Sequence, residues 1–186
     1  LGYLALSTED TGNKNTAIGY RALKDQNYDV DNFNTAVGFD AGLSMTTGVQ
    51  NTLIGGLSGD ALTGGQENVA IGYNTLSGTQ FANYNVAIGR GSMSAAALSN
   101  ANVGVGVNTL SSLSQSSGTS TYNVAVGYNA GKEITTGTNN TLIGGLAGDS
   151  ITEGEYNVAL GYNALAAEDG HGRNIAIGTN ALAVQD

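Results

Sequence analysis

The stretch that decides the fold is Asn157-Val158-Ala159-Leu160-Gly161-Tyr162-Asn163-Ala164-Leu165. Related stretches begin at nine other asparagines, and most of them follow one another at the same step, as Asn51, Asn68 and Asn85 do. The step is longer only from Asn15 to Asn34 and from Asn102 to Asn123, and a truncated copy opens the chain at residues 1–6. A constant period of about 17 residues is typical of a solenoid in which each repeat forms one coil.

Each repeat is numbered from its asparagine, which is position zero. Position four is always glycine, position three is aliphatic, position two is mostly Ala, and position one is Thr, Val or Ile. β-Branched residues favour the pleated sheet, so the motif predicts a short strand. The repeat residues are Asn15 and Gly19, Asn34 and Gly38, Asn51 and Gly55, Asn68 and Gly72, Asn85 and Gly89, Asn102 and Gly106, Asn123 and Gly127, Asn140 and Gly144, Asn157 and Gly161, and Asn174 and Gly178.

The two faces of this strand differ in bulk. Positions one and three share one face, and positions two and four share the other. Neither face carries a charge, which predicts that both are buried. We expect the bulky aliphatic side chains to point into each coil, at roughly 1.5–3 kcal/mol per buried Val or Ile. The Ala/Gly face then allows another backbone to approach closely, either a second layer of the same coil or a neighbouring chain, and it is the candidate seam between subunits.

The rest of the repeat predicts two turns and a second short strand. A second apolar residue stands near position eleven in several copies, as in Met45, Leu62, Ile134 and Ile151, and a Gly-containing turn follows. Asn at position zero tolerates left-handed turn geometry, and stacked coils would align these amides as a ladder. We therefore expect a structural role for this Asn. No window has the apolar spacing of a long amphipathic helix.

The repeats predict one domain over residues 1–186, with about eleven coils. Insertions lie near residues 25–31 and 111–122, and the second, rich in Ser and Thr, is expected to project from the solenoid. Because a coil of this length has few interior positions, we expect several rods to pack side by side. Neither end has a polar capping repeat, so we expect these residues to be a segment of a longer chain. Residues 51–60 are nearly repeated at 140–149, a duplication that suits a length-setting shaft.

Composition excludes several classes of protein. The net charge is −9 with six Lys and Arg, so no basic patch for nucleic acid is expected. The absence of Cys excludes disulfides and thiolate metal sites in these residues. No apolar run of the length needed to cross a bilayer is present, so this segment is not expected to span a membrane.

The repeat resembles known fibrous proteins. Copies such as Asn15-Thr16-Ala17-Ile18-Gly19-Tyr20-Arg21-Ala22-Leu23 resemble the repeats of trimeric autotransporter adhesin heads, and this copy and residues 140–149 look even more like repeats of phage tail fibres and related fibre proteins. The resemblance covers essentially the whole chain, although adhesin heads usually have shorter repeats.

The resemblance implies a fold, a location and a set of partners. The implied fold is a left-handed parallel β-roll, or β-solenoid, formed by a homotrimer whose chains are intertwined or lie side by side. The implied role is host attachment from a virion tail fibre, or in the alternative from the head of an adhesin on a bacterial cell surface. The expected partners are copies of this chain and a cell-surface glycan or protein receptor, and no catalytic residue or cofactor is implied.

The candidate recognition residues lie in or near the outer turns. They are Tyr28, Asp29, Phe33, Phe81, Tyr84, Gln115, Tyr122 and Tyr156. A second aromatic set follows the repeat glycine at position five: Tyr3, Tyr20, Phe39, Tyr73, Tyr128 and Tyr162. An aromatic stripe can bind sugars, but in a solenoid coil-on-coil packing is the favoured interpretation of the second set.

Two clusters could suggest a metal site or catalysis. Asp25, Asn27, Asp29 and Asp31 alternate like Ca²⁺ ligands, but the Gly and Glu of a helix–loop–helix site are missing, so a solvated acidic turn is favoured. His171 lies among Glu168, Asp169 and Arg173, but the composition indicates a turn rather than a pocket for acid–base chemistry.

Other enzyme patterns are weaker. Asp60 and Asp149 lie five coils apart, at least about 20 Å, which is too far for a glycosidase pair. The double glycines at 55–56 and 144–145 lack the Gly-Lys-Ser/Thr pattern of a phosphate loop. We therefore predict a non-enzymatic protein without metal or cofactor. The alternative from another class is a monomeric β-solenoid that binds ice or Ca²⁺.

Overall fold

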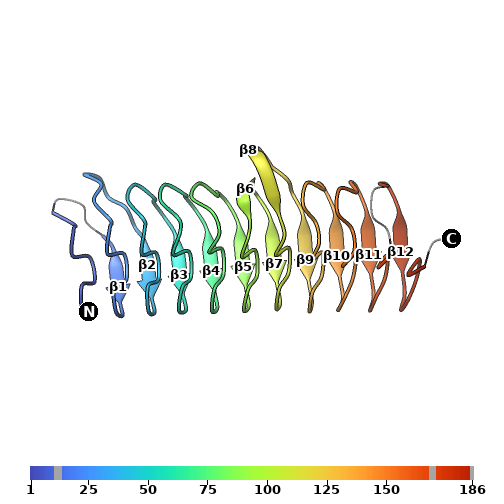
Figure 1. The fold of residues 1–186 in the computed structure, drawn as a ribbon, viewed down its shortest axis with the longest axis horizontal. Coiled ribbons are helices and arrows are strands. Elements are labelled where there is room, and N and C mark those ends of the chain that lie inside the picture. Colours follow the sequence, from blue (N-terminus) through green and yellow to red (C-terminus); the bar gives the residue numbers. More distant parts are fainter. Residues whose placement is uncertain (11–13, 168–170, 185–186) are drawn as a thin grey trace.

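The computed structural model describes residues 1–10, 14–167 and 171–184. Its main body is a ten-stranded parallel sheet in the order β1-β2-β3-β4-β5-β7-β9-β10-β11-β12. Figure 1 shows one strand from each coil standing beside the next in a single row, with the two termini at opposite ends. No helix occurs among the described residues. The predicted all-β parallel solenoid, with one sequence repeat in each coil, is therefore confirmed.

Each strand of the main sheet covers positions one to three of a repeat. Neighbouring strands pair through equivalent positions of the repeat, since Thr35 pairs with Thr52, and Val37 with Ile54. The main-sheet strands are β1 Thr16–Ile18, β2 Thr35–Val37, β3 Thr52–Ile54, β4 Val69–Ile71, β5 Val86–Ile88, β7 Val103–Val105, β9 Val124–Val126, β10 Thr141–Ile143, β11 Val158–Leu160 and β12 Ile175–Ile177. A second sheet contains β6 Ala97–Asn100 and β8 Ser114–Ser120. The truncated copy at the start stacks on the first coil without a strand, through the amide of Gly19 and the carbonyl of Leu1 at 2.9 Å.

The predicted inside and outside of the strand are reversed. Position two is buried in every strand, as Ala36, Leu53 and Ala70 illustrate, whereas positions one and three are partly or largely exposed. The aliphatic face therefore points outward and the small-residue face points into the coil. The prediction that the Ala/Gly face is the subunit seam is wrong, because position two lies inside its own coil.

The reason for the reversal is that the interior of the coil is thin and is already filled by the side chains at positions two and eight. Positions two and eight differ in size. In most coils with a small residue at position two, position eight is Leu or Met, as in Ala70 with Leu76. Where position two is Leu, position eight is Gly, as in Leu53 with Gly59. A Cβ added at Gly59 would lie 2.9 Å from Leu53 Cδ2, so one large side chain already occupies that space. The interior is one side chain thick, and close packing leaves no room for two aliphatic residues from each strand as well.

Two coils have small residues at both positions. Ala36 is followed by Gly42, and Ala125 is followed by Gly131. Leucines of the neighbouring coils supply the missing bulk, since a Cβ added at Gly42 would lie 2.8 Å from Leu23 Cδ2 and 2.9 Å from Leu53 Cδ1. The core of a coil is therefore filled by side chains of the neighbouring coils as well as by its own.

Glycine at position four is required where successive coils touch. Gly55 has φ of 132°, a region that L-residues rarely adopt, and a Cβ there would lie 2.3 Å from the carbonyl oxygen of Gly72. The same contact recurs from coil to coil along the sheet. The close backbone approach expected at this face is therefore made by the next coil of the same chain.

A ladder of buried asparagines runs through the interior. The Oδ1 of Asn68 accepts the backbone amide of Asn85 at 3.0 Å, and the Nδ2 of Asn68 donates to the carbonyl of Ala82 at 2.7 Å. Asn51 and Asn140 repeat the pattern, with Nδ2 donating to Gly65 and Gly154 at 2.8 Å. Each side chain thus ties its strand to the next coil and to the return segment of its own repeat. This is the structural role expected for position zero.

In the part of the chain that the structure describes, most coils lack the second strand predicted for each coil. The position-eleven residues Met45, Leu62, Ile134 and Ile151 are fully buried, but they lie outside any strand. The return segments stack through irregular hydrogen bonds, as where the carbonyl of Thr63 accepts the amides of Thr46 at 2.9 Å and Thr47 at 3.0 Å. Among the described residues, the return segments form one parallel strand pair, β6 with β8, and an isolated parallel bridge between Val49 and Gln66. Figure 1 shows β8 rising above its neighbours as the inserted segment was expected to do.

We predict that Asn68→Ala lowers the free energy of unfolding by about 3 kcal/mol, because it leaves a buried amide and a buried carbonyl without partners. Urea denaturation at one fixed protein concentration measures the change. The matched control is Asn27→Ala on an exposed residue, which should stay within about 0.5 kcal/mol of the parent. Equal midpoints for the two variants would contradict the structural role of the ladder.

A swap tests the thin core. Leu53→Ala should destabilise by about 2–5 kcal/mol through the cavity it leaves, and Gly59→Leu by about 1–3 kcal/mol through overpacking. The double variant has the small–large pairing found at Ala70 and Leu76, and its loss should be smaller than the sum of the two single losses by at least about 1.5 kcal/mol. Strictly additive losses in thermal or urea unfolding would show that the two side chains do not share one space.

Candidate functional site

The outer face of the main sheet carries two uncharged columns of side chains. Position one contributes Thr16, Thr35, Thr52, Val69, Val86, Val103, Val124, Thr141, Val158 and Ile175. Position three contributes Ile18, Val37, Ile54, Ile71, Ile88, Val105, Val126, Ile143, Leu160 and Ile177. We call these twenty residues the aliphatic face. Nine intervals of about 4.8 Å make it roughly 43 Å long.

The aliphatic face is accessible along its whole length. Ile54 and Ile143, in the interior of the sheet, are 38% and 39% exposed, and Ile177 at the end is 65% exposed. Parallel sheets are normally covered on both faces, and a contiguous exposed apolar patch marks an interaction surface. The geometry therefore presents one flat, uncharged surface suited to another apolar face.

A second column borders the aliphatic face at the residue before each repeat Asn, which we call position −1. All ten such residues have positive φ, between 52° and 65°. They are Lys14, Phe33, Gln50, Glu67, Tyr84, Ala101, Tyr122, Asn139, Tyr156 and Arg173. This left-handed geometry costs an L-residue about 1–2 kcal/mol, and Asn or Gly adopts it most easily. Four aromatic residues occur here nevertheless, all of them exposed, so neither backbone preference nor core packing explains them.

Backbone hydrogen bonds keep the position −1 column straight. The amide of Tyr84 donates to the carbonyl of Gln66 at 3.0 Å, and the amide of Tyr156 donates to that of Thr138 at 3.0 Å. The amides of Ala101 and Asn139 make the same contact with the preceding coil, at 3.0 Å to the carbonyl of Asn83 and 2.8 Å to that of Thr121. The column is therefore a regular array of side chains one strand spacing apart.

The predicted recognition residues divide between this column and other places. Phe33, Tyr84, Tyr122 and Tyr156 are all at position −1. Tyr28 and Asp29 lie exposed in the first insertion, and Gln115 in β8 donates from Nε2 to the carbonyl of Thr136 at 3.1 Å. Phe81 lines a separate cavity of about 300 Å³ with Gly78, Thr79, Gln80, Ala97 and Leu98. The eight residues therefore do not form one surface.

Polar groups accompany several of the column's aromatic rings. Gln66 Nε2 donates to the Tyr84 hydroxyl at 3.1 Å, and Lys14 Nζ lies 5.0 Å from the centre of the Phe33 ring. The Arg173 guanidinium carbon lies 5.9 Å from the centre of the Tyr156 ring. Cation–π contacts of this kind hold a ring in place without burying it.

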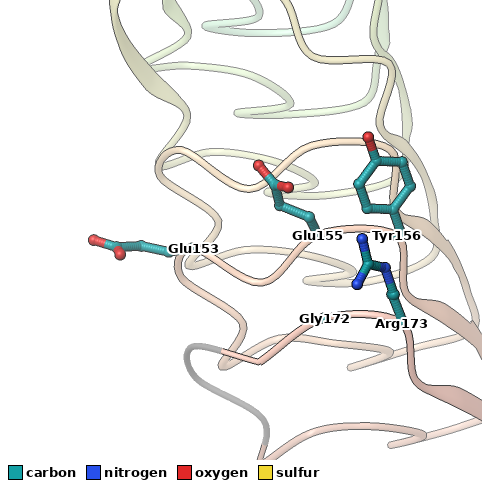
Figure 2. Close-up of a pocket in the computed structure, with 5 residues that line it drawn as sticks. All are labelled: Glu153, Glu155, Tyr156, Gly172 and Arg173. Carbon is teal, nitrogen blue, oxygen red and sulfur yellow. The ribbon is translucent and has the colours of Figure 1, made fainter.

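A cavity lies at the C-terminal end of the column. It has a volume of about 340 Å³ and is lined by Glu153, Glu155, Tyr156, Gly172 and Arg173. Figure 2 shows Glu155, Tyr156 and Arg173 gathered on one side, with Glu153 pointing away. Of these residues, the sequence analysis predicts only Tyr156 as a recognition residue. The positions of the other two in the repeat could have indicated them, because Glu155 directly precedes Tyr156 and Arg173 occupies position −1 of the next repeat.

The aromatic residues at position five pack from coil to coil at the N-terminal end. The rings of Tyr3 and Tyr20 lie 5.5 Å apart, and those of Tyr20 and Phe39 lie 5.3 Å apart, both pairs nearly parallel. Where position five is Gly, the neighbouring ring covers it, since a Cβ at Gly56 would lie 3.5 Å from Tyr73 Cδ2. Coil-on-coil packing, the favoured interpretation, is therefore found in these contacts.

The acidic segment of the first insertion is divided among separate ion pairs. Asp25 pairs with Lys24 at 2.7 Å, and Asp31 pairs with Lys14. No group of three or more acidic or His side chains that could hold a metal ion occurs among residues 1–10, 14–167 and 171–184. Of the other cluster, His171 is exposed and its carbonyl accepts Asn157 Nδ2 at 3.4 Å, whereas Glu168 and Asp169 lie outside the described residues.

Asp60 and Asp149 occupy equivalent turns after β3 and β10, five strand positions apart in the sheet. Burial raises the pKa of both carboxyl groups. Asp60 Oδ1 is buried without a hydrogen-bond partner, whereas Asp149 has the charge of Lys132 and a hydrogen bond to Ser150 nearby, which oppose the effect. The arrangement indicates two isolated turn carboxylates rather than a catalytic pair.

These shifts predict a pH dependence. Because the folded pKa of Asp60 lies above its unfolded value, the folded state binds the proton more tightly, and this group's contribution to stability falls as pH rises from the unfolded pKa through the folded pKa. Asp60→Asn should therefore raise the melting temperature at pH 7, and the gain should vanish below the ordinary Asp range. Asp149→Asn is the matched control with a smaller expected gain. Calorimetry at pH 3 and pH 7 measures both, and a gain for Asp60→Asn that is larger at pH 3 would contradict the assignment.

Comparisons with protein-family models, with curated proteins and with solved structures find no match to this chain. The described part of the chain contains no helix long and apolar enough to cross a membrane.

Proposed function

We propose that this chain is a structural and adhesive segment of a trimeric fibre, in which three copies pack their aliphatic faces against one another. The observation that carries the proposal is the uncharged outer face of the ten-stranded sheet, accessible over its whole length. A solenoid whose interior is one side chain thick gains a second, larger core when three such faces meet. The resemblance of the repeats to trimeric adhesin heads and tail-fibre repeats supports the number three.

The role that fits this arrangement is host attachment by a phage tail fibre. The duplication of residues 34–76 at 123–165 and the uniform coils suit a stiff element that sets a length and displays its outer side chains. The head of a bacterial trimeric surface adhesin is the alternative with the same physics. Both place the segment outside the cell, and neither requires catalysis, nucleic acid, a cofactor or membrane contact by these residues.

The solution mass of the chain tests the proposal. We expect multi-angle light scattering to give three times the chain mass of 18.7 kDa. A dimer would retain the aliphatic face as an interface but overturn the trimer. A well-folded monomer would overturn the fibre proposal and leave the monomeric ice- or Ca²⁺-binding solenoid as the remaining interpretation.

A pair of variants identifies the seam. Ile71→Lys with Ile88→Lys places two charges on neighbouring outward positions of β4 and β5, and we expect a folded monomer because burying unpaired charges at an interface is strongly unfavourable. Gln80→Lys with Thr136→Lys adds the same charge at exposed positions away from the aliphatic face and should remain trimeric. Circular dichroism confirms folding. If the two doubly charged variants have the same mass, the seam is not the aliphatic face.

A further inference from the structure

Three exposed tyrosines of the position −1 column stand on every second strand of the sheet. Tyr84 precedes β5, Tyr122 precedes β9 and Tyr156 precedes β11, and the intervening strands β7 and β10 are preceded by Ala101 and Asn139. The side chains are 50%, 59% and 52% exposed. Two strand spacings separate successive tyrosines by about 10 Å. The five φ values, 60°, 59°, 52°, 58° and 59°, give these residues the same left-handed backbone conformation.

We propose that these residues bind a linear, uncharged, β-1,4-linked polysaccharide lying along the fibre axis. In such a chain alternate pyranose rings present the same face, so the disaccharide repeat is close to the tyrosine spacing of about 10 Å. Every second sugar then stacks on a tyrosine. The sugar between two stacked rings lies over a small side chain at Ala101 and over a hydrogen-bonding amide at Asn139.

The cavity at Tyr156 supplies polar contacts to one end of the glycan. Glu155 accepts hydrogen bonds from sugar hydroxyl groups, and the Arg173 guanidinium donates to ring or hydroxyl oxygens beside the same tyrosine ring (Figure 2). Its volume of about 340 Å³ lies in the range of small-ligand sites. The charges disfavour an anionic polymer, because the chain carries a net charge of −9 and both Glu153 and Glu155 line this cavity beside Arg173.

The stacking ladder predicts how affinity depends on chain length. A trisaccharide reaches two tyrosines and a pentasaccharide reaches three, so affinity should rise between these lengths by at least about tenfold and change little at the hexasaccharide. Titration calorimetry with cello- and chito-oligosaccharides measures this, and the two series distinguish plain from N-acetylated sugars. Malto-oligosaccharides have the same glucose units in α-1,4 linkage, which curves the chain away from a straight ladder, and they should not bind.

The middle tyrosine gives the sharpest variant. Tyr122→Asn keeps a residue that tolerates this backbone, as Asn139 does in the next coil at φ of 58°, and should weaken pentasaccharide binding at least about tenfold. Tyr122→Phe retains the ring and should bind nearly as the parent does. The matched control is Tyr128→Ala, which removes an equally exposed tyrosine from position five and should leave affinity unchanged.

The inference rests on the proposed attachment role and deepens it by naming the class of receptor that is recognised. Glycan binding and trimer formation are nevertheless tested independently of each other. Absence of heat with millimolar β-1,4-linked oligosaccharides, equal binding of the α-1,4-linked series, or equal losses for Tyr122→Asn and Tyr128→Ala would each overturn it. Light scattering on the same samples reports the mass, so a monomer that binds glycan contradicts only the fibre proposal, and a trimer that binds none contradicts only the ladder.

Discussion

The buried asparagine at position zero is the interaction on which the rest of the structure depends. Its side chain satisfies a backbone amide in the next coil and a carbonyl of its own coil's return segment, so the strand side and the return side are held together in every repeat. A return segment with almost no regular strand pairing would otherwise leave buried peptide groups unsatisfied, which costs about 1–3 kcal/mol for each group. Each Asn meets the next Asn in register, even across the two longer coils, where Asn15 accepts the amide of Asn34 at 3.0 Å and Asn102 accepts that of Asn123 at 2.9 Å.

That constraint explains what the sequence could predict. The period, the parallel register, the short strand at positions one to three and the glycine contacts between coils all follow from Asn and Gly recurring in the same places. The choice of inner face did not follow, because both faces of the strand are apolar and alternation alone cannot tell them apart. The inner face is indicated by a longer-range pattern, in which a small residue at position two is paired with a large one at position eight or the reverse. Ala70 with Leu76 and Leu53 with Gly59 are examples.

The candidate surface was predictable in part for a similar reason. Phe33, Tyr84, Tyr122 and Tyr156 could be recognised as exposed aromatic residues, since they fall outside the strand motif. Their common left-handed backbone could not, because nothing local in Tyr or Phe favours positive φ. At Tyr84 and Tyr156 this backbone is held by hydrogen bonds to the preceding coil. The register therefore converts scattered aromatic residues into a column. Phe81 and Gln115, outside that register, remain apart from it.

The two outward surfaces of the solenoid differ in chemistry, and the difference separates their roles. The aliphatic face has no charge and few hydrogen-bonding groups, so its hydration is unfavourable in free energy. Burial against another apolar face removes this unfavourable hydration. The position −1 column beside it carries hydroxyl, amide and charged groups around exposed rings, which bind better at a wet boundary than in a dry core. Backbone hydrogen bonds between coils hold the column in register, and a second core outside the thin interior would stiffen the rod further. Association through the aliphatic face would do so and would leave the tyrosines along the rim of the seam.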